Sequence, residues 1–75
     1  MKYFSYDPNG EGFQLHKTEQ EAREEAANAI DEERKHAVSE GWNEEVTEIC
    51  WGEIKGISSI TEKRDDGIDY GLVAA

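Results

Sequence analysis

The sequence predicts an α+β domain in which one helix packs on a small antiparallel sheet, in the order ββα followed by two or three strands. Three observations support this prediction: a turn signal between two alternating segments near the start, a helix-capping signal at Thr18, and a return to strand-like patterns after residue 46. A length of 75 residues fits one domain covering 1–75. Its core is expected to be small, because short chains bury a limited share of their surface.

The first two elements are predicted to be a β-hairpin. Phe4 and Tyr6 fall on one side of an alternating segment, and Phe13 and Leu15 fall on one side of the next. Between them, Asp7-Pro8-Asn9-Gly10 suits a turn, because Asp can bond the backbone ahead, Pro presets φ, and Gly accepts a left-handed conformation.

A helix is predicted from Thr18 to about Ser39. Thr18 and Glu21 form a capping box, in which the Thr18 hydroxyl accepts from the Glu21 amide and the Glu21 carboxylate reaches back to the Thr18 amide. Gly41 is expected to end the helix. The apolar stripe has helical spacing but is mostly alanine, which favours close packing on a sheet over a coiled coil. Its members are Ala22, Ala26, Ala29, Ile30 and Ala37.

The remaining chain is predicted to form strands. Residues 46–54 carry apolar side chains on both faces, which is typical of a central strand, and Gly52 weakens that strand or marks a bulge. Residues 57–63 and 68–73 are the expected last strands, joined by a turn at Asp65-Asp66-Gly67. Ile30 and Trp51 are expected to be buried, so their replacement by alanine should destabilise the fold more than any change on the acidic helix face.

Negative charge is concentrated in the middle of the chain. The net charge is −10, and residues 19–53 alone contain twelve acids and three bases, a net of −9. Such a surface repels DNA, RNA and anionic membranes and attracts basic partners. No apolar run is long enough to span a bilayer, and the first residues lack the apolar core of a signal peptide, so a cytoplasmic location is expected.

The acidic helix face and the segment after it are the candidate binding surface, with Trp42 as an aromatic anchor beside acids. Pairs at i,i+4 spacing, Glu19 with Arg23 and Asp31 with Lys35, would neutralise part of this charge. The alternative interpretation is an ordinary solvated helix exterior. The candidate partner-binding residues are Glu21, Glu24, Glu25, Asp31, Glu32, Trp42, Glu44 and Glu45.

No catalytic or metal motif is specific, so we expect neither an enzyme nor a cofactor. Asp7, Asn9 and Glu11 resemble the start of a calcium loop, but Thr18 stands where such a loop needs a bidentate carboxylate. His36 is expected to pair with Glu32 on the helix surface. Cys50, the single cysteine, suits a reducing compartment and is expected to be a small buried hydrophobe.

Six short segments carry a resemblance to known proteins: Lys2–Asp7, Gly12-Phe13, His16–Thr18, Glu21-Ala22, Glu45-Val46 and Ile49–Glu53. Together they resemble small acidic proteins encoded by temperate phages and prophages. The resemblance covers about the first 54 residues and carries no catalytic residues. It implies an accessory protein acting inside a bacterial host cell, where such proteins often inhibit host defence or replication proteins, sometimes by imitating DNA.

Together these observations lead to three hypotheses. In the first, the chain is a non-enzymatic phage-type protein that binds, and inhibits, a host protein with a basic surface, one that handles nucleic acid or serves in defence. In the second, it is a homodimeric structural or accessory protein that self-associates through a sheet edge or a patch around Trp42, and its acidic surface serves only solubility. In the third, it is a small metal-dependent or regulatory factor.

Overall fold

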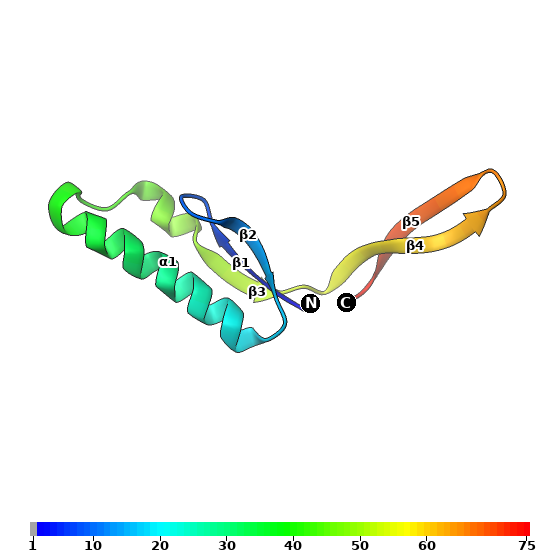
Figure 1. The fold of residues 1–75 in the computed structure, drawn as a ribbon, viewed down its shortest axis with the longest axis horizontal. Helices are drawn as coiled ribbons and strands as arrows, with labels where there is room; N and C mark the ends of the chain where they lie inside the picture. Colours follow the sequence, from blue (N-terminus) through cyan, green and yellow to red (C-terminus); the bar gives the residue numbers. More distant parts are fainter. Residues whose placement is uncertain (1) are drawn as a thin grey trace.

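The structure, a computed structural model, describes residues 2–75 and confirms the α+β class. A three-stranded antiparallel sheet of order β2-β1-β3 carries the single α-helix, and the last two strands form a separate antiparallel sheet (Figure 1). The elements in chain order are β1 Tyr3–Asp7, β2 Gly12–His16, α1 Glu19–Glu40, the 3-10 helix η1 Glu44–Glu48, β3 Cys50–Glu53, β4 Gly56–Arg64 and β5 Gly67–Ala74.

The first hairpin forms as predicted. The Gly10 amide donates to the Asp7 carbonyl oxygen at 3.3 Å, and the Asn9 amide donates to Asp7 Oδ1 at 3.1 Å. One detail of the prediction was wrong, because the positive φ of this turn, 72°, belongs to Gly12 and not to Gly10. The paired register places Phe4 opposite Leu15 and Tyr6 opposite Phe13.

The helix also begins and ends where the sequence indicates. The Glu21 amide donates to Thr18 Oγ1 at 3.2 Å, and Gly41 ends the helix with φ 81° and a bond from its amide to the Ala37 carbonyl. The second half of the capping box differs from the prediction. Glu21 Oε2 accepts from the Lys17 amide at 3.3 Å, one residue before the expected donor.

The segment 46–54 is the main correction. Residues 46–48 belong to η1, and β3 is an edge strand, because the central strand of the sheet is β1. Local hydrogen bonds account for this turn. Asn43 Oδ1 accepts from the Glu45 amide at 2.9 Å, and Thr47 Oγ1 donates to the Glu44 carbonyl at 3.0 Å.

The helix packs on the more polar face of the sheet, which carries Ser5, Gln14 and Trp51. Ser5 is only 3% exposed, lies between Gln14 and Trp51 in the register, and shares a hydrogen bond with His16 Nε2 at 2.7 Å. Ala22 and Ala26 are buried against this face, so the backbone of α1 comes close to the sheet.

The interior is consequently smaller than the sequence predicts. Among residues 2–75, no large side chain is fully buried. Trp51, expected in the core, is 40% exposed, Ile30 is half-buried, and Cys50 is exposed. The costs expected for Ile30→Ala and Trp51→Ala must therefore be lowered, because the free energy lost on truncation scales with the area that was buried.

The C-terminal hairpin extends away from the body formed by α1 and the three-stranded sheet (Figure 1). Strands β4 and β5 pair along their length, with one irregularity between Ile60 and Glu62. The turn at Asp65-Asp66 is where the sequence places it. The expectation that all strands join one sheet was wrong, because β4 and β5 pair only with each other.

Candidate functional site

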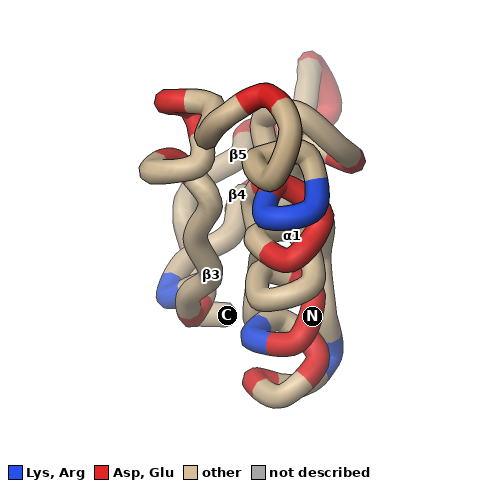
Figure 2. Tube along the Cα trace, turned by 90° about the vertical axis from the view of Figure 1, so that its left-hand side faces the viewer, with Lys and Arg blue, Asp and Glu red and all other residues tan. Residues whose placement is uncertain are grey.

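The predicted acidic residues lie on α1 and at the start of η1, where nearly all of them are exposed. Figure 2 shows acidic positions spread along α1 and only a few basic positions among them. Of the candidates, Glu25 alone is half-buried. The helix supplies a rigid support for these carboxylates, because 22 residues of continuous helix fix their spacing.

The helix does not place all the candidates on one side. Glu21, Glu25 and Glu32 follow one flank, because spacings of four and seven residues return to the same side of a helix. Glu24 and Asp31 are seven residues apart and follow the side turned away from the sheet. The acidic surface therefore covers one flank and the outer side of α1.

Trp42 lies on the other flank. The guanidinium of Arg34 is 5.8 Å from the centroid of the Trp42 ring. Arg34 and Glu32 are two residues apart, about 200° around the helix, so the tryptophan is separated from the Glu21 flank. Glu44 and Glu45 follow Trp42 in the chain and occupy the first turn of η1. The structure thus divides the predicted site into a helical acidic surface and a Trp42 end.

The ion pairs on α1 differ from the predicted i,i+4 pairs. Arg34 pairs with Asp31, and Lys35 Nζ lies 3.0 Å from Glu32 Oε1, both at i,i+3 spacing. The expected pairs of Glu19 with Arg23, Asp31 with Lys35, and His36 with Glu32 are absent from the ion pairs of residues 2–75. Exposed pairs such as these contribute about 0–1 kcal/mol each.

The other members of the surface keep their charge without a basic partner in the described part of the chain. Glu24 Oε1 accepts a hydrogen bond from Gln20 Nε2 at 2.9 Å, which leaves its charge in place. Glu25, Glu44 and Glu45 form no ion pair within residues 2–75. Because no basic residue lies in the last turn of α1, its C-terminal end stays negative as well.

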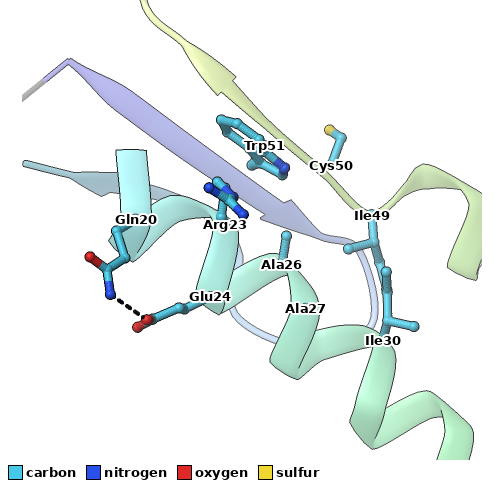
Figure 3. Close-up of a pocket in the computed structure, with 9 residues that line it drawn as sticks. All are labelled: Gln20, Arg23, Glu24, Ala26, Ala27, Ile30, Ile49, Cys50 and Trp51. Atoms are coloured by element: carbon cyan, nitrogen blue, oxygen red, sulfur yellow. Dashed lines mark hydrogen bonds between the residues drawn. The ribbon is translucent and has the colours of Figure 1, made fainter. Parts of the chain in front are cut away.

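An open groove between α1 and β3 was not predicted from the sequence. It is lined by Gln20, Arg23, Glu24, Ala26, Ala27, Ile30, Ile49, Cys50 and Trp51 (Figure 3). The guanidinium of Arg23 lies 5.9 Å from the Trp51 ring centroid, which explains why Arg23 does not pair with Glu19. The only sequence signal for the groove is the alanine stripe, because small side chains leave room between the helix and an edge strand.

The groups in this groove can hold an apolar or aromatic side chain, with Arg23 and Glu24 at the rim. No group of three or more metal-ligating side chains is found among residues 2–75. None of the helices in that part of the chain combines the length and apolarity that crossing a membrane requires.

Comparison of this chain with protein-family models, with curated proteins and with solved structures gives no match. The resemblance to small acidic phage proteins therefore stays a prediction from the sequence.

Proposed function

We propose that this chain is a non-enzymatic binding protein whose acidic helix holds the basic surface of a partner protein. The observation that carries the proposal is the exposed, largely unpaired acid on a rigid helix, with a net charge of −9 between residues 19 and 53. The resemblance adds a setting, in which the partner is a host protein of a bacterium and binding inhibits it.

Self-repulsion supports a binding role for this charge. Repulsion among many unpaired acids lowers the stability of the fold. A helix surface that only has to stay solvated needs fewer acids than this one carries. Across an interface, the same acids raise the association rate for a basic partner and fix its orientation. Trp42 and the groove beside Trp51 supply the apolar contacts that an acidic surface lacks.

Imitation of DNA is the narrower form of this proposal. From Glu21 to Glu32 the helix rises about 16 Å and presents five acids. Duplex DNA carries about one charge per 1.7 Å, which gives about nine over the same length. The helix has about half that density, so a generally basic protein surface fits it better than a site built for duplex DNA.

The test compares two variants with equal loss of charge. The first replaces the acidic surface: Glu24→Gln, Glu25→Gln, Asp31→Asn and Glu32→Gln. The control removes four acids outside residues 19–53: Glu11→Gln, Asp65→Asn, Asp66→Asn and Asp69→Asn. Partners are captured from bacterial lysate at low and high salt, and association rates with the captured protein are then measured for all three chains.

The proposal expects the first variant to associate more slowly, with a weaker salt dependence, while the control stays near the parent. Melting temperature is measured on the same samples, and the first variant should be as stable as the parent or more stable. If it binds as fast as the parent at low salt, the charge serves only solubility.

A further inference from the structure

The outer face of the three-stranded sheet is apolar and uncovered. Side-chain alternation places Phe4, Tyr6, Phe13 and Leu15 on this face, opposite the one that α1 covers. The rings of Phe4 and Phe13 stack with their centroids 5.6 Å apart, yet Phe13 is 60% exposed. Antiparallel sheets that face water on one side usually carry polar side chains there, so an apolar face of this kind is unusual for a surface that stays in contact with water.

The β4–β5 hairpin carries a second uncovered apolar face. Ile68, Tyr70 and Leu72 alternate along β5 and therefore share one face, and the register places Ile60 opposite Tyr70 on the same side. All four side chains are exposed, Leu72 by 82%. Neither α1 nor the three-stranded sheet packs on the hairpin (Figure 1).

Such a hairpin is incomplete by itself. Two isolated strands are marginally stable in water and need a third strand or a covering layer. The body also has little buried apolar area, because no large side chain of residues 2–75 is fully buried. The body and the hairpin therefore each expose an apolar face, and each face could cover the other.

The dimensions of the chain lead to the same conclusion. Its radius of gyration is 17.1 Å, whereas a compact chain of this length has about 11 Å. It exposes 5775 Å², which exceeds the area of a compact 8.5 kDa monomer by about 1,100 Å². A standard interface buries about 800 Å² on each partner, so the excess is enough for a stable dimer.

We propose that the occupant of both faces is a second copy of this chain. The apolar face of each β4–β5 hairpin covers the outer sheet face of the other copy, about a two-fold axis. Both halves of the contact are then present in one sequence, as an isologous interface requires.

The connection between β3 and β4 argues against a hairpin folded back on its own sheet. Only Ile54 and Lys55 join the strands, and both keep ladder-type backbone bonds, from the Ile54 amide to the Lys2 carbonyl and from the Ala75 amide to the Lys55 carbonyl. The first bond fixes the Ile54 amide to the three-stranded sheet and the second fixes the Lys55 carbonyl to the hairpin, so a reversal of the chain would have to occur within the few backbone torsions between these two groups. Alternation through this extended segment instead places Cys50 and Ile60 on one side, so both apolar faces can meet a copy on that side.

Charge also favours a second copy. The outer sheet face has no acid among its paired residues between Phe4 and Tyr6, and the central part of the hairpin face is apolar. The acidic helix lies on the opposite side of the sheet, so in the dimer both helices point outward. This arrangement keeps the two negative surfaces apart and leaves them free for a partner.

The test is the mass of the full chain in solution, measured by light scattering and sedimentation equilibrium over a wide range of concentration. The parent should have twice the chain mass of 8.5 kDa. Leu72→Asp and Phe13→Asp should each weaken dimerisation on the order of tenfold or more, because a charge enters an apolar contact. The matched control is Val38→Asp, which puts the same charge on an 88% exposed valine of α1 and should leave the mass unchanged.

Mixing the two variants identifies the contact. Leu72→Asp keeps an intact sheet face and Phe13→Asp keeps an intact hairpin, so their mixture retains one of the two contacts and should form more dimer than either alone. Alkylation of the exposed Cys50 gives an independent readout, because Cys50 lies on the outer sheet face. Its rate should fall with protein concentration in the parent and not in Leu72→Asp.

Circular dichroism on the same samples shows whether each variant keeps α1. A parent that stays at single-chain mass at every concentration would overturn the proposal, whether or not it binds another protein. So would a dimer that Phe13→Asp leaves intact, because that result would mean that hairpins contact hairpins or that edges pair.

Discussion

Gly52 shows how tightly the outer sheet face is fitted at the scale of one residue. A Cβ built on Gly52 would lie 2.8 Å from Cε1 of Phe4 and 3.0 Å from its Cζ. The ring can therefore approach β3 this closely only because residue 52 has no side chain. In the sequence Gly52 indicates a weak strand or a bulge, and in the structure its role is close packing with an aromatic ring.

We predict that Gly52→Ala destabilises the fold by about 1–3 kcal/mol, because the Phe4 ring must leave its stack with Phe13. Gly67→Ala is the matched control, since its added methyl meets nothing within 4 Å and should be nearly neutral. Denaturant unfolding measures both. In a Phe4→Ala background the cost of Gly52→Ala should largely disappear, and an unchanged cost there would assign it to the backbone.

Thr18 is a second residue whose replacement should measurably lower the stability of the fold. Its hydroxyl accepts from the Glu21 amide at the start of α1. We predict that Thr18→Ala lowers the free energy of unfolding by about 0.5–2 kcal/mol. Thr47→Ala removes an exposed hydroxyl in η1 and should cost less. Equal and negligible effects of both changes would show that α1 starts elsewhere.

At the scale of the element, the alanine stripe sets the distance between α1 and the sheet. Ala22 and Ala26 are the buried contacts, and Ser5 opposes them from β1. Such small side chains allow close approach, whereas the stacked Phe4 and Phe13 rings on the other face would hold a helix away. This fit explains why the helix covers the more polar face.

We predict that Ala26→Leu destabilises the protein by about 1–3 kcal/mol, because the larger side chain pushes α1 off β1. Ala27→Leu places the same side chain on the next residue, which is exposed, and should be tolerated. Thermal and denaturant melts of the pair compare them directly. If Ala26→Leu instead stabilises the fold, the space between α1 and the sheet is loosely filled and the alanine stripe is not a close contact.

The sequence predicts the type of most elements because local signals determine them. Caps, turns and alternation identify α1, the first hairpin and the last hairpin, whose signals lie within a few residues. The face that α1 covers is different, since that choice depends on the fit between two distant surfaces. Residues 46–49 were misassigned because alternation also fits a turn that Asn43 stabilises through its side chain.

The candidate site divides in the same way. Counting charges along the chain locates the acidic surface, because exposure of a charged helix face follows from composition. The ion pairs on α1 cannot be predicted from residue spacing alone, because Arg23 and Arg34 lie over the rings of Trp51 and Trp42. The contact between Arg23 and Trp51 forms only when the tertiary structure brings β3 beside α1. The separation of Trp42 from the Glu21 flank depends on the path of the chain after Gly41, which brings the ring to Arg34.

For the whole molecule, the arrangement separates two kinds of surface. Acid lies on α1, on one side of the three-stranded sheet, and uncovered apolar side chains lie on the other side and on the β4–β5 hairpin. Electrostatic and apolar association respond differently to ionic strength. The two proposed contacts can therefore be distinguished in the same solution.

We predict opposite salt dependences for the two contacts. Two copies that each carry −10 repel one another, so raising salt from about 0.05 to about 0.5 M should strengthen self-association by screening. The same increase in salt should weaken binding of a basic partner, because salt also screens the attraction between opposite charges. Sedimentation follows the first and association kinetics the second. If self-association weakens as salt rises, opposite charges hold the copies together, and the contact must involve the few bases, Lys63 and Arg64 among them.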